Sequence, residues 1–219
     1  MGTEKGVAAM VCIVKVERNH GKIKVTLDDG RTFFLIKSCL QDWFPEADQV
    51  IDEKEFEKRV LVNQYRSALD KAVGMLAVRA RSRGEIEQGL RRNGFAGETI
   101  KMVIYKLESN QLLNDQEFAF QWVNYRMGQK YGPRRITQEL KMKGISGEDA
   151  EKALSEMEEE DYLKDAIVIG RKASLRLKST DDLRKARQKI SAAIVRRGYD
   201  WEVARQACDY ILDNKDFEN

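Results

Sequence analysis

The sequence predicts a mainly α-helical protein: three tandem three-helix repeats in an elongated, curved body, preceded by a small N-terminal antiparallel β meander. Three observations predict this class. Apolar residues recur at helical spacing through most of the chain. One helix–glycine–helix pattern occurs three times, and the β-branched runs are confined to the N-terminal part. The 219 residues are enough for a substantial core even though 34% of them are charged.

The N-terminal extension, residues 1–60, is predicted to be β-rich with a short helix. The predicted strands are Met10–Val16, Ile23–Leu27 and Thr32–Ile36. The turn at Asp28, Asp29 and Gly30 carries the Asp-Gly hairpin signal. Three short strands bury little apolar surface, so we expect the meander to lean on a helix. Asp52 and Glu55 have the spacing of a capping box, which predicts the start of that helix.

The helical part repeats the pattern Ile-x3-[Leu/Ile]-x3-Gly-apolar-x2-Glu. Its glycines are Gly94, Gly144 and Gly198, which lie 50 and 54 residues apart. In each copy a helix ends at glycine, which adopts the left-handed conformation easily, and a second helix follows with Glu in its first turn. A third helix, after Asp115 or Asp165, leads to the next copy. Because one unit cannot bury its apolar stripe alone, we expect the units to stack.

The copies set the predicted boundaries: repeat 1 covers 61–128, repeat 2 covers 129–179, and repeat 3 with a C-terminal tail covers 180–219. Pro133 suits the first turn of the helix that opens repeat 2.

Charge is dense, nearly balanced overall and unevenly distributed. The chain has a net charge of +3, which excludes a strong polycation. By region, the net charge is −1 over 1–62, +4 over 63–130, −4 over 131–165 and +4 over 166–219. Alternating patches of this kind favour contact with a charged macromolecular partner.

The residue inventory argues against an enzyme, a metal site and a cofactor. His20 is the one histidine, which excludes sites built from two or more imidazoles. Phosphate-binding glycine motifs are absent, and no nucleophile–base pair can be proposed. The three widely spaced cysteines contain no CxxC pair, which fits a reducing cytoplasm. The sequence has no apparent signal peptide and no stretch apolar enough to span a membrane.

Basic residues precede each repeat glycine and crowd one helix near residue 171. Stacked repeats would align the equivalent positions into rows that follow a polyanion. The helix dipole favours Lys and Arg in any last turn, so a purely structural role stays open. The second helix of each copy starts with the carboxylates Glu98, Glu148 and Glu202. They would repel a DNA backbone, which disfavours sequence-specific reading of the major groove.

Three blocks of sequence carry a family resemblance: Leu76–Ile86, Leu113–Ala119 and Tyr131–Ile145. Together they resemble the RecX regulatory proteins, bacterial modulators of the RecA recombinase. Leu76–Ile86 (LAVRARSRGEI) is similar to the family's first repeat, and Leu113–Ala119 (LNDQEFA) to its Leu-Asp-Asp-x-x-Phe-Ala signature, with Asn114 where Asp is usual. Tyr131–Ile145 (YGPRRITQELKMKGI) resembles the Gly-x-x-x-Ile-x-x-Glu-Leu-x-x-Lys-Gly-Ile block. The resemblance covers about residues 60–213. The N-terminal extension resembles that of longer members from Gram-positive bacteria.

This resemblance implies a non-enzymatic regulator that binds in the groove of the RecA–single-stranded-DNA filament. Such a protein inhibits the recombinase, ATPase and co-protease activities of RecA, and so acts in recombination, DNA repair and the SOS response. The implied partner is the filament, with single-stranded DNA as a second candidate, and the protein is expected to be a cytoplasmic monomer without cofactors. The expected filament or DNA contacts are Arg126, Lys130, Arg134, Arg135, Lys141, Lys143, Arg171, Lys172 and Arg176. The alternative is an autonomous helical repeat module that binds nucleic acid non-specifically.

Overall fold

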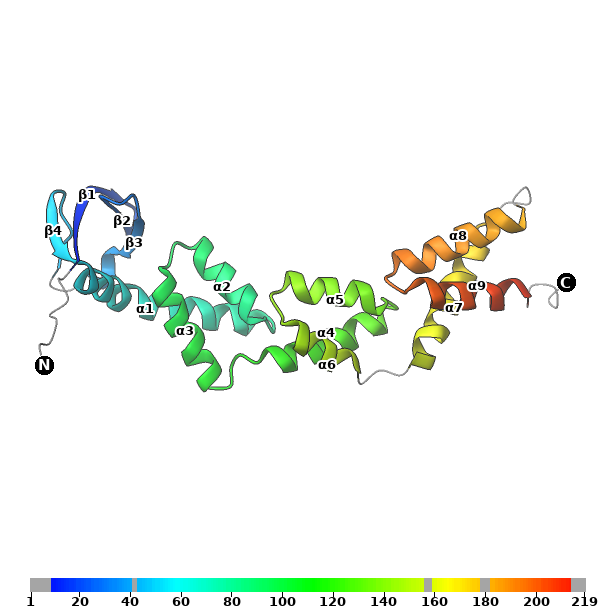
Figure 1. Ribbon diagram of the computed structural model, residues 1–219. Coiled ribbons are helices and arrows are strands. Elements are labelled where there is room, and N and C mark those ends of the chain that lie inside the picture. The colour runs from blue at the N-terminus through cyan, green and yellow to red at the C-terminus, as the bar shows by residue number, and fades with distance from the viewer. Residues whose placement is uncertain (1–8, 41–42, 156–158, 178–181, 214–219) are drawn as a thin grey trace, which may run out of the picture. The chain divides into compact units, whose positions relative to one another are not determined.

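The computed structural model describes residues 9–40, 43–155, 159–177 and 182–213, with no side-chain description for 159–161. The chain divides into two compact units, Met1–Asn114 and Asp115–Asn219. Unit 1 contains β1 (Met10–Asn19), β2 (Lys22–Leu27), β3 (Thr32–Ile36), a 3-10 turn (Lys37–Cys39), β4 (Gln49–Asp52), α1 (Glu53–Val78), α2 (Arg83–Arg92) and α3 (Gly97–Ser109) (Figure 1). Unit 2 contains α4 (Asp115–Gly128), α5 (Pro133–Met142), α6 (Gly147–Ser155), α7 (Glu159–Ser174), α8 (Leu183–Arg196) and α9 (Trp201–Asp213).

The N-terminal strands form one antiparallel sheet with the order β3-β2-β1-β4. The three predicted strands are confirmed. The turns between them contain Gly21 at φ 76° and Gly30 at φ 84°, a backbone conformation that favours glycine. His20 is exposed in the first of these turns. The fourth strand, β4, was not predicted. It pairs with Met10–Ile13 of β1, about 40 residues earlier in the chain.

The sheet leans on α1, which confirms the expectation that a helix supports it. Asp52 caps this helix by accepting a hydrogen bond from the Glu55 backbone N–H at 3.0 Å. Phe56 and Val60, on the first turns of α1, complete the apolar core beneath the strands, where Ile13 and Leu35 are fully buried.

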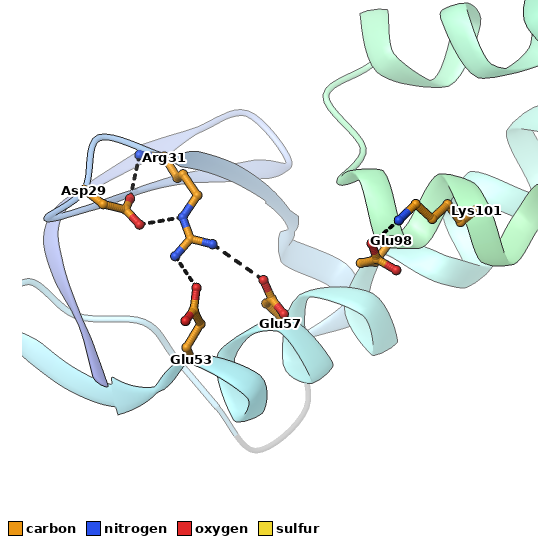
Figure 2. Close-up of polar contacts among 6 residues, drawn as sticks. All are labelled: Asp29, Arg31, Glu53, Glu57, Glu98 and Lys101. Atoms are coloured by element: carbon orange, nitrogen blue, oxygen red, sulfur yellow. Dashed lines mark hydrogen bonds and ion pairs between the residues drawn. The ribbon is translucent and has the colours of Figure 1, made fainter. Parts of the chain in front are cut away.

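Arg31 joins the sheet to the start of α1 (Figure 2). Its guanidinium bonds Asp29 in its own turn and Glu53 on the helix, both at 2.5 Å, and reaches Glu57 at 3.5 Å. The four side chains are each about 31–44% exposed, so solvent screens these ion pairs and they add little stability. Their main role is to orient the sheet relative to α1.

The three copies of the sequence pattern fold alike. Each first helix (α2, α5 and α8) ends at a left-handed glycine: φ is 83° at Gly94, 80° at Gly144 and 97° at Gly198. In the first two copies the residue after glycine donates its N–H to a carbonyl five residues back, Phe95 to Leu90 and Ile145 to Leu140. This is the Schellman arrangement that satisfies the last carbonyls of a helix. The predicted glycine caps are therefore confirmed.

The helices group into α1–α3, α4–α6 and α7–α9, which we call repeats 1, 2 and 3 from here on. In each group the first helix packs on the next two, and each group has its own buried cluster. The predicted boundary at 128 assigns Asp115–Gly128 to the first repeat, whereas α4 packs on α5 and α6. The physical reason is that α4 buries Phe118, Ala119 and Val123 against Ile136 and Leu140 of α5. The predicted tail after Asp213 lies outside the described residues.

Candidate functional site

Two loops of unit 2 meet backbone to backbone. The Gly132 N–H donates to the Arg197 carbonyl at 2.8 Å, and the Arg134 N–H donates to the Gly198 carbonyl at 3.1 Å. A Cβ on Gly132 would lie 2.5 Å from the Gly198 carbonyl carbon, and one on Gly198 would lie 2.3 Å from the Cβ of Arg135. The glycines thus permit an approach that larger residues would block. We call this contact the glycine clamp.

The clamp holds repeat 3 against repeat 2 and borders an open cleft of about 460 Å³. The α4–α5 loop and the start of α5 form one wall, and the C-terminal turns of α7 and α8 form the other. Among the residues that the structure describes, six cations and no carboxylate line it. We call it the basic cleft, and its charged lining is Lys130, Arg135, Lys172, Arg176, Arg196 and Arg197.

Two of the six cations are neutralised locally. Lys130 pairs with Asp165 on α7, and Arg135 bonds Glu139 at 3.2 Å one turn along α5. Within the described ranges, no carboxylate pairs with the other four, which are Lys172, Arg176, Arg196 and Arg197. The C-termini of α7 and α8 end nearby, and each contributes roughly half a negative charge. Two helix ends offset about one of the four unpaired charges, so the cleft stays strongly positive.

Tyr131 stands at the centre of the cationic wall. The guanidinium carbons of Arg126, Arg135 and Arg197 lie 3.9, 4.3 and 4.8 Å from its ring centroid. Such contacts with the face of an aromatic ring are attractive and help to orient the guanidinium groups. Arg197 is also fixed by a 3.1 Å hydrogen bond to the Gln129 carbonyl. The cations of this wall are therefore held before any ligand arrives.

Glu139 supports the same wall from behind. It accepts hydrogen bonds from Arg126, from Arg135 and, at 3.2 Å, from the Trp122 indole. Burial raises the pKa of the Glu139 carboxyl, but the hydrogen bonds from Arg126 and Arg135 outweigh it, and the net pKa lies below its ordinary value. The carboxylate therefore stays charged and keeps both arginines in place.

The structure sorts the nine predicted contact residues into three groups. Four line the basic cleft: Lys130, Arg135, Lys172 and Arg176. Two are engaged in packing: Arg126, whose side chain is 13% exposed, bonds Glu139, and Lys143 lies 4.1 Å from the centroid of the Trp122 ring. Three lie outside the cleft lining: Arg134 borders a second hollow beside Arg196, Lys141 is exposed on α5, and Arg171 lies 6.0 Å from the Tyr210 ring.

Arg196 and Arg197 line the cleft but are not among the nine. The available signal was their position just before the third repeat glycine, where Arg197 is equivalent to Lys143 of the second copy and Arg196 to Met142. That equivalence alone could not distinguish a ligand contact from a helix-end cation.

The acidic starts of the second helices have partners on their own helices. Glu98 pairs with Lys101 at 2.7 Å (Figure 2), Glu148 with Lys152 at 2.6 Å, and Glu202 with an arginine one turn on. Their negative charge is favourable near the N-terminal ends of these helices and offers no cationic surface to a DNA groove. Among the described residues no cluster could hold a metal ion. In the same part of the chain, no helix combines the length and apolarity needed to cross a membrane.

The fold and its repeated helix–glycine–helix copies define a tandem three-helix-domain protein. A family model described as the first three-helix domain of RecX matches residues 68–107, and the second three-helix domain of RecX matches 114–154. Regulatory protein RecX of Prosthecochloris aestuarii is 36% identical over 150 residues, 68% of this chain and 96% of that protein. Its counterpart in Clostridioides difficile is 26% identical over 213 residues, 95% of this chain and 100% of that protein.

Solved structures agree. A crystal structure of regulatory protein RecX matches with a TM-score of 0.63 and 23% identity over 91% of this chain and 99% of that chain. RecX from Lactobacillus salivarius matches with a TM-score of 0.62 and 25% identity, over 67% and 96%. The chain belongs to the RecX family of regulatory proteins. The resemblance seen in the sequence, including the likeness to Gram-positive members, is confirmed.

Proposed function

We propose that this protein regulates RecA by lodging in the groove of the RecA–single-stranded-DNA filament. It inhibits the recombinase, ATPase and co-protease activities of RecA, and so acts in recombination, repair and the SOS response. It works by binding rather than catalysis, as a cytoplasmic monomer without a cofactor. The observation that carries the proposal is membership of the RecX family across both matched three-helix domains.

The structure supports a binding role through the basic cleft. In the described part of the chain, no carboxylate lines the cleft and four of its cations have no carboxylate partner. Arg134, Lys141 and Arg171 add exposed cations outside its lining. Charge complementarity of this kind raises the association rate and fixes the register of a complex. Arg126 and Lys143, by contrast, contribute by holding the surface in shape.

The direct test measures the DNA-dependent ATPase of RecA with substoichiometric amounts of the full chain. We expect inhibition at ratios well below one per RecA protomer, because a protein seated in the groove blocks filament growth. Reversing two cleft charges, in Lys172→Glu/Arg176→Glu, should weaken inhibition at least tenfold. A matched control is Arg184→Glu/Lys185→Glu at the other end of α8. Full ATPase activity at stoichiometric amounts of the wild-type chain would contradict the proposal.

The basic cleft is also compatible with a second function, in which the protein is an autonomous module that binds nucleic acid non-specifically. The two are separated by comparing naked with RecA-coated single strands in a salt titration. A filament regulator binds the coated strand well and the naked strand weakly. An autonomous module binds the naked strand tightly, with a steep salt dependence and no need for RecA.

A further inference from the structure

We infer that the basic cleft between repeats 2 and 3 binds the phosphodiester backbone of a single nucleic-acid strand, without regard to base sequence. This inference rests on the proposed function. Within the complex with the RecA–DNA filament, it assigns the contacts with DNA, as opposed to those with RecA, to this cleft. Three observations carry it: the cations without a carboxylate partner among the described residues, the mutual pairing of main-chain groups at the clamp, and the cations that already contact the Tyr131 ring.

The charge of the cleft matches a series of phosphates. Lys172 and Arg176 come from the end of α7, and Arg196 and Arg197 from the end of α8, so the four cations converge from two helices. Arginine presents a planar fork of donors that suits phosphate oxygens. Neutralising phosphates with such groups releases bound counterions, which is the main source of sequence-independent affinity.

The walls of the cleft are poorly suited to a peptide. An extended peptide gains affinity by adding main-chain hydrogen bonds to an exposed edge. Here the Gly132 and Arg134 N–H groups and the Arg197 and Gly198 carbonyls are already bonded to one another. A helical peptide needs a long apolar groove, whereas the apolar part of this lining is Val168, Ile169, Ala173 and Ala193. Recognition must therefore pass through side-chain cations.

Tyr131 is a poor platform for a base. Three guanidinium carbons already lie within 5 Å of its ring centroid, so a base would have to displace cations to stack on the ring. Stacking on an aromatic ring is what normally adds base contacts to a single-strand site. Without an open ring in the cleft, the strand is held by its backbone.

The test measures binding of fluorescent oligothymidylate to the full chain at about 50 and about 200 mM salt. Each phosphate contact contributes about 0.7 to the slope of log affinity against log salt for single strands, so removing two lowers the slope by about 1.4. Wild type should therefore lose about sevenfold more affinity between the two salt concentrations than Lys172→Gln/Arg176→Gln does. The control Arg184→Gln/Lys185→Gln should keep the wild-type slope, because Arg184 begins α8 about 18 Å from Arg196.

Two modified ligands test the chemistry without changing the protein. An abasic strand should show the same affinity ratio between wild type and the cleft variant, because no base is read. A methylphosphonate strand, which lacks the phosphate charge, should bind the two proteins equally. An unchanged salt slope in Lys172→Gln/Arg176→Gln would overturn the inference. So would competition for the cleft by polyglutamate at concentrations where oligothymidylate has no effect, which would assign the cleft to an acidic protein segment.

The RecA ATPase assay, run in parallel, separates this inference from the proposed function. If wild type fails to inhibit RecA but the slopes differ as expected, the proposed function fails and the cleft assignment stands. If wild type inhibits RecA and the slopes are equal, the cleft assignment alone fails.

Discussion

The same helix–glycine–helix loop is docked in two different ways in the two units. In unit 2 the α8–α9 loop meets the α4–α5 loop through backbone hydrogen bonds between glycine-flanked segments. In unit 1 the α2–α3 loop meets the sheet through side chains: Lys22 donates to the Asn93 carbonyl at 3.1 Å, and the ring of Phe34 covers Gly94. The sheet thus occupies, for repeat 1, the place that repeat 2 occupies for repeat 3.

A buried amide makes the second kind of docking possible. Gln64 on α1 is fully buried, donates to the Phe34 carbonyl, and accepts from the Ala96 N–H at 2.7 Å and the Thr99 hydroxyl at 3.1 Å. One side chain therefore ties β3 to the start of α3. In unit 2 the hydrogen bonds to the repeated loop come from the backbone of a neighbouring repeat, and in unit 1 they come from side chains. An unrelated element such as the sheet can therefore pack on the same loop if its side chains and those of α1 supply the hydrogen bonds.

The largest effect should come from breaking the glycine clamp. In Gly132→Ala the new Cβ would lie 2.5 Å from backbone atoms of Gly198, which cannot rotate away. Overpacking plus the loss of two backbone hydrogen bonds should lower the free energy of unfolding of unit 2 by about 3 kcal/mol. Urea unfolding followed by the fluorescence of Trp122 and Trp201 measures this.

The matched substitution in unit 1 is Gly94→Ala. Gly94 has a left-handed backbone (φ 83°), so alanine there adds a strain of about 1 to 2 kcal/mol that Gly132, at φ −80°, does not have. The new Cβ, however, meets the ring of Phe34 at 2.7 Å, and a side chain can shift. We expect a smaller loss than for Gly132→Ala. Equal losses in the free energy of unfolding would show that the glycine clamp tolerates an added Cβ as well as the contact between Gly94 and the sheet does.

The second effect tests the side-chain docking. Gln64→Leu keeps a side chain of similar size but removes the amide. The Ala96 N–H, the Thr99 hydroxyl and the Phe34 carbonyl then lose this partner. Unpaired buried polar groups should cost about 2 kcal/mol or more in the stability of unit 1. Thermal unfolding by circular dichroism measures the loss, with the exposed Gln121→Leu as control. A loss of the same size in Gln121→Leu would refute the role of Gln64.

Most of the fold could be predicted from local patterns. The glycine caps, the Asp52 cap and the three consecutive strands depend on residues close in sequence, and the structure confirms them. The strand β4 could not be predicted, because Gln49–Asp52 is short and its partner lies in β1. The grouping of α4 with α5 and α6 also depends on which apolar faces meet, and the spacing of the copies leaves that choice open.

The candidate site was predicted less completely, for a physical reason. Sequence spacing located the cations but could not show which of them already had partners. Arg126 is engaged by the Glu139 carboxylate, whereas Arg196 and Lys172, which converge from two helices, have no carboxylate partner among the described residues. Partner choice is a tertiary property, and it separates a cation that holds the surface in shape from one that is free to bind.

The third effect concerns the support of the cationic wall. Because the folded pKa of Glu139 is lowered, its stabilisation is present above the unfolded pKa of about 4.3 and is lost as pH falls through the lower folded value. Glu139→Gln should cost about 1 to 2 kcal/mol at pH 7. The difference in free energy of unfolding between Glu139→Gln and wild type should become smaller as pH falls below about 4.3. Urea midpoints at several pH values measure it, and a gap independent of pH would rule out the charged carboxylate as its source.

The smallest effect should be a gain in the free energy of unfolding. It tests whether a glycine outside the two docked loops is needed for close packing. Gly74 lies inside α1, and a Cβ there would meet nothing within 4 Å. Alanine is favoured over glycine in a helix interior, so Gly74→Ala should stabilise unit 1 by about 0.5 to 1 kcal/mol. Thermal unfolding compares it with Gly132→Ala. A destabilised Gly74→Ala would mean that α1 needs a close approach there, whereas a stabilised one shows that Gly74, unlike the clamp glycines, serves no close contact.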